Sequence, residues 1–307
     1  MKKFLYKGIL FFLIFFLVEK STYLIINRLP VLEYDKRLEL LIKGEINKEL
    51  IVLGSSRGVT NVLAHQIEDQ TGLTTFNLSY MGSNILFHEF ILQTLLKYNS
   101  TPEKIIFVID NPYEFIDVKS LTFRYDRMYP LSKYNYINNE LINQKERNLL
   151  SKVFGLARLT WTDFKLEKKA IPIDNPMYST GSMPYIRKIP KINLKYNTTS
   201  VDYSSLNEST NKLEAFKNIQ KICSKNNIEL IFVFSPDYRK FNDSFKKRFE
   251  KLLKPENRLM VYDTLNPVYK NSEYYYDASH LLKNGATIFT SEITDFLKMS
   301  YNSEKIN

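Results

Sequence analysis

The chain contains little cysteine, glycine or histidine. Its 307 residues include one cysteine, nine glycines and three histidines. The lone Cys223 excludes an internal disulfide and leaves no cysteine pair for a zinc motif. It falls at helical spacing with Phe216 and Ile219, which predicts a small buried side chain. With 21 tyrosines and 21 phenylalanines against so few glycines, we expect a core packed from bulky side chains.

Long runs of one charge are also missing. The net charge is +10, from 43 Lys and Arg against 33 Asp and Glu, yet no five consecutive residues are basic. Nucleic-acid binding concentrates basic residues in a patch, so the dispersed lysines disfavour a nucleic-acid partner. They favour a solvated basic surface beside anionic lipid or a polyanionic glycan. The sequence has none of the usual clusters of metal ligands, and we expect no metal and no cofactor.

One apolar stretch stands at the N-terminus. Gly8–Val18 is an unbroken apolar run of 11 residues that follows Lys2, Lys3 and Lys7. No small-x-small cleavage site follows, so the helix is expected to continue past Lys20 as an uncleaved anchor. The lysines place the N-terminus in the cytoplasm, which predicts a single-pass protein with its body outside the cytoplasm. A buried helix of a cytosolic protein is disfavoured, because apolar side chains occupy every side.

The rest of the chain alternates strand and helix patterns. We expect a membrane anchor over 1–26, a connector over 27–48 and an α/β domain over 49–307, with an irregular, Tyr-rich insertion at about 112–205. The clearest strand is Lys104–Ile109, an apolar run typical of a strand buried on both faces of a parallel sheet. The other expected strands are Glu49–Leu53, Thr75–Leu78, Ile228–Phe234 and Leu259–Tyr262. The expected helices are Arg37–Ile42, one through Val59, Leu63 and Ile67 that stops at Gly72, Ile85–Lys97, Asn211–Lys225, Asn242–Leu253 and a final helix after His280.

This alternation predicts an α/β fold with a three-layer, doubly wound, flavodoxin-like parallel sheet. In such sheets, ligands bind at the carboxyl ends of the strands.

Two short motifs fall at that edge. Ser56 lies in Leu-Gly-Ser-Ser-Arg, directly after the first expected strand, where a serine can serve as a nucleophile if a base takes its proton. His280 lies in Asp-Ala-Ser-His-Leu before the last helix, with Asp277 three residues upstream to hold the imidazole in the required tautomer. The alternative is local structure: a helix cap at the serine and a turn at the Asp-His pair. We expect Arg57 to pair with a carboxylate on the first helix.

These motifs resemble those of the SGNH/GDSL hydrolase superfamily. Gly54-Ser55-Ser56 is similar to its first block, with Ser56 in the nucleophile position, and Asp277, His280 and Leu281 match its last block. More narrowly, the pattern resembles membrane-anchored, extracytoplasmic SGNH-like proteins of bacterial envelope polysaccharide systems. The resemblance implies an oxyanion hole formed by the amides of Ser56 and Gly82 and by an asparagine after the third strand. The third block of the family, Gly-x-Asn-Asp, is absent, and Asn111 in Asp110-Asn111 is the candidate for that asparagine.

The leading hypothesis is an extracytoplasmic serine-dependent acyl esterase or O-acyltransferase acting on a cell-envelope glycan or related ester. The expected partners are the membrane and an acylated glycan or small ester, with a membrane acyltransferase as a further candidate. The alternative is a catalytically inactive SGNH-like module that binds a glycan or docks a partner, which the missing third block favours. The sequence leaves open the acyl group, hydrolysis versus transfer and the oligomeric state.

Overall fold

The computed structural model describes residues 1–188, 193–199 and 202–304. The chain forms two compact units. The first combines Met1–Glu39 with Arg124–Ala170, and the second combines Leu40–Phe123 with Ile171–Asn307. The predicted insertion at about 112–205 is therefore divided between the two units, and it includes 189–192 and 200–201, which lie outside the described residues.

The second unit is built on a five-stranded, all-parallel sheet with the order β2-β1-β3-β4-β5. Its strands are β1 (Leu50–Gly54), β2 (Thr75–Asn77), β3 (Lys104–Ile109), β4 (Glu229–Phe234) and β5 (Arg258–Val261). This is the flavodoxin-like order, and the predicted fold class is confirmed. The strand order reverses between β1 and β3, the point at which ligands bind in such sheets.

Helices cover both faces of the sheet. Alternate strand residues such as Val52, Ile106 and Val233 form one core with Phe289 and Ile293. Phe289 and Ile293 belong to α10 (Lys283–Glu304). This helix packs beside α3 (Ser56–Asn61) and α4 (Ala64–Thr71).

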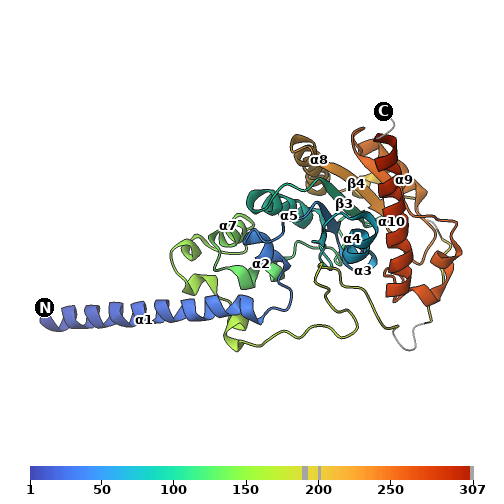
Figure 1. The fold of residues 1–307 in the computed structure, drawn as a ribbon. Coiled ribbons are helices and arrows are strands. Elements are labelled where there is room, and N and C mark those ends of the chain that lie inside the picture. The colour runs from blue at the N-terminus through green and yellow to red at the C-terminus, as the bar shows by residue number, and fades with distance from the viewer. Residues whose placement is uncertain (189–192, 200–201, 305–307) are drawn as a thin grey trace. The chain divides into compact units, whose positions relative to one another are not determined.

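The opposite face of the sheet is aromatic. Phe232 of β4 meets Phe107 of β3, Phe216 and Phe249, with ring centroids 5.1 to 5.5 Å apart. Phe216 belongs to α8 (Thr210–Lys225), which packs beside α5 (Ile85–Tyr98), and Phe249 belongs to α9 (Asp243–Leu252). The two helical layers enclose the strands (Figure 1). The phenylalanine-rich composition thus fills one of the two interfaces between sheet and helices.

The helix expected to run from Val59 to Gly72 is instead two helices. It breaks at Val62 and Leu63, whose backbone is extended. Side chains provide hydrogen bonds to the backbone at the break. The carbonyl of Val62 accepts from Ser182 at 2.8 Å, and the amide of Leu63 donates to Thr290 at 3.1 Å. Both partners are distant in sequence, so local periodicity could not reveal the break. The predicted stop at Gly72 is confirmed, since Gly72 has φ +77°.

The first unit is helical. Its long helix α1 (Lys2–Leu32) extends six residues beyond the predicted anchor boundary at 26. It is followed by α2 (Arg37–Ile42), which the unit boundary crosses, and the unit also holds α6 (Tyr125–Met128) and α7 (Asn135–Asn143). Four short 3₁₀ helices complete it: η1 (Tyr129–Leu131), η2 (Leu149–Lys152), η3 (Leu156–Arg158) and η4 (Trp161–Lys165). The remaining 3₁₀ turns, in the second unit, are η5 (Ser205–Asn207), η6 (Pro267–Lys270) and η7 (Ser272–Tyr274).

Within the described residues, α1 is long and apolar enough to cross a membrane. The large apolar side chains of its N-terminal part, including Phe4, Phe11, Phe15 and Val18, are exposed. Its buried residues gather at the other end, at Thr22, Ile26, Leu29, Pro30 and Leu32. The helix therefore has an uncovered apolar part and a part that packs against the other helices of its own unit.

Candidate active site

The first functional side chain is positioned by a sharp end to β1. Gly54 has φ +153°, and a Cβ there would lie 3.0 Å from both the Cβ and the carbonyl oxygen of Val108. Only glycine fits this close approach to β3 without strain. The chain then turns directly into α3, whose first residue is Ser56. The turn places Ser56 at the carboxyl edge of the sheet, beside the reversal point of the strand order.

Ser56, His280 and Asp277 form a continuous hydrogen-bonded chain. Ser56 Oγ lies 2.7 Å from His280 Nε2, and His280 Nδ1 lies 2.9 Å from each carboxylate oxygen of Asp277. The Ser56 and His280 positions are 224 residues apart in the sequence. The side chain of His280 is 18% exposed and that of Asp277 is 35% exposed. The three residues are thus in bonding distance of one another and open to solvent.

The Asp277 carboxylate is held by backbone as well as by the imidazole. Its Oδ1 accepts from the amides of Ser279 at 2.7 Å and His280 at 3.0 Å. Burial alone would raise the pKa of Asp277, but the hydrogen bonds and charge of His280 and these two amides outweigh it and lower the pKa. Asp277 is therefore ionised at neutral pH, in the form that accepts the Nδ1 proton and leaves Nε2 to face the serine. The local turn expected as an alternative and the bond to Ser56 are both present.

Asn61 links the loop that carries His280 to the helix that carries Ser56. Its Oδ1 accepts the amide of Leu281 at 3.0 Å, and its Nδ2 donates to Ser235 Oγ at 2.9 Å. Asn61 is the last residue of α3 and is fully buried. It therefore acts as a positioning residue between α3, the end of β4 and the His280 loop. Sequence reasoning missed it, because nothing in the sequence distinguishes this asparagine from other asparagines.

Two tyrosines stand beside the imidazole. The rings of Tyr185 and Tyr276 are stacked, with centroids 3.6 Å apart and planes 3° from parallel, and the Tyr185 ring lies 5.7 Å from that of His280. Tyr185 comes from the Tyr-rich stretch predicted as an insertion. An aromatic wall therefore borders the solvent-accessible side chains of the triad.

The candidate oxyanion donors lie at the ends of the neighbouring strands. Gly82, with φ +67°, belongs to the loop after β2, and Tyr80 of that loop donates its amide to the carbonyl of Gly54 at 3.0 Å. Asn111 follows β3. Its Oδ1 is buried and has no hydrogen-bond partner among the described residues. The loops of Gly82 and Asn111 thus flank the start of the Ser56 loop, while the oxyanion roles of Ser56, Gly82 and Asn111 stay predictions.

We expected Arg57 to pair with a carboxylate on the first helix, and this prediction is wrong. Its side chain points into the interior, where one nitrogen donates to Asp237 at 3.0 Å and another to the carbonyl of Asn111 at 3.2 Å. A third nitrogen lies 3.8 Å from Asp110. Burial alone would lower the pKa of Arg57, but the charges of Asp237 and Asp110 outweigh it and raise the pKa. The guanidinium thus stays charged and joins the ends of β3 and β4 to the serine loop.

A carboxyl pair lies behind the nucleophile position. Ser55 Oγ donates to Asp110 at 2.7 Å, and the amide of Asp110 donates to Glu114 at 2.8 Å. Burial first, and then the charge of Asp110, raise the pKa of Glu114 to about 8. Burial raises the pKa of Asp110 too, but Arg57 and the Ser55 hydroxyl oppose that rise. We therefore assign the negative charge to Asp110 and a proton to Glu114. Ser55 is fully buried and Ser56 is half-buried, so Ser55 supports the loop and Ser56 carries the accessible hydroxyl.

The other two histidines do not join the triad. His88 is buried, with its Nε2 2.7 Å from Ser83 Oγ, and burial lowers its pKa to about 3. His65 is half-buried against Tyr178, with ring centroids 5.2 Å apart. His280 is therefore the histidine whose ring joins Ser56 to a carboxylate.

The arrangement can activate a hydroxyl group. An imidazole bonded to a serine can take the hydroxyl proton as the oxygen attacks a carbonyl carbon, and the carboxylate stabilises the imidazolium that forms. The imidazole can then return the proton to the departing group. The same constellation of serine, histidine and acid occurs on unrelated folds, so the geometry itself carries the chemical argument.

Comparisons with known proteins add only a distant structural likeness. No protein-family model and no curated protein sequence matches the chain. A solved structure from Bacteroides fragilis NCTC 9343, described as a "putative acylhydrolase", is similar with a TM-score of 0.40 and 10% sequence identity. The match covers 88% of this chain and 95% of the other. A likeness at this level carries no argument about activity.

Replacing Arg57 with alanine should destabilise the α/β unit. The Arg57→Ala substitution leaves Asp110 buried without its cation, while Asp237 keeps Arg239 at 2.8 Å. We expect a loss of about 3–5 kcal/mol. Native-state hydrogen exchange of the β3 and β4 amides measures this loss within the unit. The control is Lys246→Ala, which removes an exposed pair with Glu250 and should cost less than about 1 kcal/mol. Equal protection in the two variants would contradict the structural role of Arg57.

Proposed function

We propose that the protein is a serine-dependent acyl esterase or O-acyltransferase. Ser56 Oγ attacks the carbonyl carbon of an ester while His280 Nε2 takes its proton. The tetrahedral intermediate collapses, His280 gives the proton to the departing alcohol, and the acyl group stays on Ser56 as an ester. Water or another hydroxyl group, deprotonated by His280, then attacks this ester and releases Ser56. Attack by water is hydrolysis, and attack by a second alcohol is transfer.

The observation that carries this proposal is the relay from Ser56 through His280 to Asp277. Its distances of 2.7 and 2.9 Å are those of direct hydrogen bonds. Asp277 is held in its ionised form by two amides. A helix cap or a surface turn would need neither the serine-imidazole bond nor the orientation of the imidazole by a carboxylate. The geometry therefore favours the catalytic hypothesis over the inactive binding module, which remains the outcome if no activity is found.

In this proposal, the oxyanion of the intermediate is held by the amides of Ser56 and Gly82 and by the side chain of Asn111. One feature supports the part of Asn111: it follows β3 next to Asp110, which bonds to Ser55 behind the Ser56 position. In this role the Nδ2 group of Asn111 would donate to the oxyanion, because an amide oxygen can only accept. Asn111 would thereby supply what the absent third block supplies in the family that the motifs resemble.

The proposed location is the outer face of a bacterial cell membrane, with α1 as a single-pass signal anchor. The support is the length and apolar surface of α1 and the placement of Lys2, Lys3 and Lys7 before its apolar run. Basic residues flanking a span favour the cytoplasmic side. The α/β unit would then lie outside the cytoplasm.

The proposed substrate is an acylated cell-envelope glycan or a related ester. The stacked pair Tyr185 and Tyr276 beside His280 supports this substrate class, because aromatic faces can pack against the apolar face of a sugar ring. The net charge of +10 favours an anionic surface nearby. A membrane acyltransferase that supplies or receives the acyl group is a further proposed partner.

Removing the nucleophile or the base should abolish ester hydrolysis. For Ser56→Ala and His280→Ala we expect kcat/KM for p-nitrophenyl acetate to fall on the order of 10⁴-fold or more, because the relay acts as a unit. The matched control is Ser224→Ala, an exposed serine on α8, which should retain full activity. Undiminished hydrolysis by Ser56→Ala would refute the assignment. A folded wild-type protein without activity on any ester would favour the binding module.

Replacing the carboxylate with an amide should have nearly as large an effect. Asp277→Asn preserves the shape of the side chain but presents an N–H to His280 Nδ1 and stabilises the wrong tautomer, and we expect a fall of about 10⁴-fold in kcat. Steady-state kinetics measures it. The control Asp174→Asn changes an exposed aspartate that pairs loosely with Arg187, at 3.9 Å, and should leave kcat unchanged. A loss of less than tenfold in Asp277→Asn would show that Asp277 does not orient the imidazole.

A further inference from the structure

The uncovered apolar surface of the first unit is not confined to α1. A second group of large apolar side chains lies in the segment 149–166, which includes η2, η3 and η4. Seven of them are between 43% and 91% exposed: Leu149, Leu150, Val153, Leu156, Trp161, Phe164 and Leu166. So many exposed apolar side chains within 18 consecutive residues exceed the scattered exposure that is normal on a soluble surface. We call this group the apolar segment.

The apolar segment lies against α1. The ring of Phe154 meets that of Phe15 edge to face, with centroids 5.7 Å apart. The carboxylate of Glu19 accepts the amides of Gly155 and Leu156, the latter at 3.2 Å. A Cβ on Gly155 would lie 2.7 Å from Thr22 Oγ1, so the two backbones approach closely. Residues 154–156 of the segment are therefore fixed at the level of residues 15–22 of the helix.

That level is within or next to the apolar part of α1. The 31 residues of α1 extend over about 46 Å at 1.5 Å per residue, which exceeds the roughly 30 Å of a bilayer's hydrocarbon core. The exposed apolar side chains run through Phe15 to Val18, and burial inside the unit begins at Thr22. A bilayer that covers the exposed part of α1 thus reaches the residues that the apolar segment touches.

The Glu19 contact also removes an obstacle to insertion. A carboxylate on a membrane helix is costly unless it is paired or hydrogen-bonded. The Glu19 carboxylate accepts hydrogen bonds from the amides of Gly155 and Leu156. These bonds stabilise the charge and also fix the apolar segment to α1.

The remaining charges of the apolar segment suit a membrane interface. Arg158 is buried and donates to Ser151, Ser132 and Asn135, and Asp163 accepts the amide of Thr160 in a capping box. The exposed ionised side chains that remain are Lys152 and Lys165. Lysines at this position can extend their ammonium groups to lipid phosphates while their methylene stems stay apolar.

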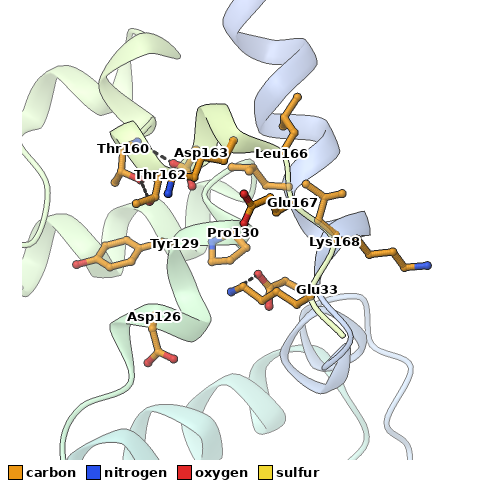
Figure 2. A pocket seen from close by; sticks show the side chains of 14 residues that line it. Glu33, Asp126, Tyr129, Pro130, Thr160, Thr162, Asp163, Leu166, Glu167 and Lys168 are labelled. Atoms are coloured by element: carbon orange, nitrogen blue, oxygen red, sulfur yellow. Dashed lines mark hydrogen bonds and ion pairs between the residues drawn. The ribbon is translucent and has the colours of Figure 1, made fainter. Parts of the chain in front are cut away.

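A pocket of roughly 490 Å³ lies between the end of α1 and residues 160–169 (Figure 2). Of its four carboxylates, Glu33 pairs with Lys169, Asp163 accepts the amide of Thr160 and Asp126 pairs with Arg124. Lys168 extends away from the pocket in Figure 2. The pocket is lined jointly by the end of α1, at Leu29 and Leu32, and by the C-terminal part of the apolar segment, from Thr160 to Leu166.

We propose that the apolar segment is a second membrane contact, which inserts beside α1 into the outer leaflet of a bilayer that contains anionic lipids. The inference rests on the proposed anchor, since it takes the membrane level from α1. The first unit would then contact the membrane at two places and lie in the interface. Trp161, whose neighbours Thr160 and Thr162 line one pocket with Leu29 of α1, would lie at the level of the headgroups.

The chain provides its own reporter, because Trp161 is its single tryptophan. The full-length protein is reconstituted in vesicles of phosphatidylcholine and phosphatidylglycerol, with and without brominated acyl chains. We expect a blue-shifted Trp161 emission that brominated lipid quenches and aqueous iodide does not. Co-flotation of the protein with the vesicles after alkaline carbonate treatment reports the anchor independently of Trp161.

The outcomes separate the two proposals. Co-flotation with red-shifted, iodide-accessible emission would overturn the second contact and leave the anchor in place. Emission shielded from iodide but insensitive to brominated lipid would overturn it in favour of a covering protein, such as a second copy of the chain. Failure to co-float would overturn both. Hydrolysis of a soluble ester measures the proposed activity separately from all three outcomes.

A pair of substitutions tests the apolar segment directly. Leu150→Asp combined with Val153→Asp should greatly reduce quenching of Trp161 by brominated lipid, while co-flotation through α1 persists. The control is Leu206→Asp, which places the same charge on a leucine that is 94% exposed in the second unit and should leave the quenching unchanged. Equal quenching in all three proteins would contradict the proposal.

Discussion

The buried guanidinium of Arg57 is the constraint on which the site depends. It follows Ser56 in the sequence, and it is 3% exposed between Asp237 after β4 and Asp110 after β3. A buried charge needs partners of opposite sign, so the chain must bring the ends of β3 and β4 to the serine loop. Once they are there, Ser55 turns inward to Asp110 and Ser56 is left facing outward. The outward direction of the Ser56 hydroxyl thus follows from the buried charges behind it.

The histidine reaches the serine through a separate set of contacts. The loop of His280 is fixed by Asn61 through the amide of Leu281 and by Asp277 through its own turn. Ser56 is the first and Asn61 the last residue of the same helix of six residues. This helix therefore positions both the Ser56 hydroxyl and, through Asn61, the loop that carries the His280 imidazole. The activity proposed for the second unit and the membrane contacts proposed for the first use different residues, and each unit can be tested without the other.

Much of the fold could be predicted from the sequence, because strands buried on both faces appear as apolar runs and amphipathic helices as periodic ones. All five strands and four helices, such as Ile85–Tyr98, begin and end within one residue of expectation. The break at Val62 and the partners of Arg57 could not be foreseen, since both depend on side chains more than 100 residues away, Ser182 and Asp237. Ser56, His280 and Asp277 were found by motif, whereas the positioning role of Asn61 carries no local signal. The boundary between the units also escaped prediction, because 124–170 pairs with the N-terminus through contacts that periodicity does not encode.

Covalent labelling reports whether His280 activates Ser56. The full-length protein is treated with a fluorophosphonate, and the modified residue is located by peptide mass spectrometry. We expect a phosphonyl group on Ser56, and its loss in His280→Ala, because only a serine relieved of its proton attacks the reagent at a useful rate. Modification of a different serine, or a folded protein in which Ser56 remains unmodified, would contradict this expectation.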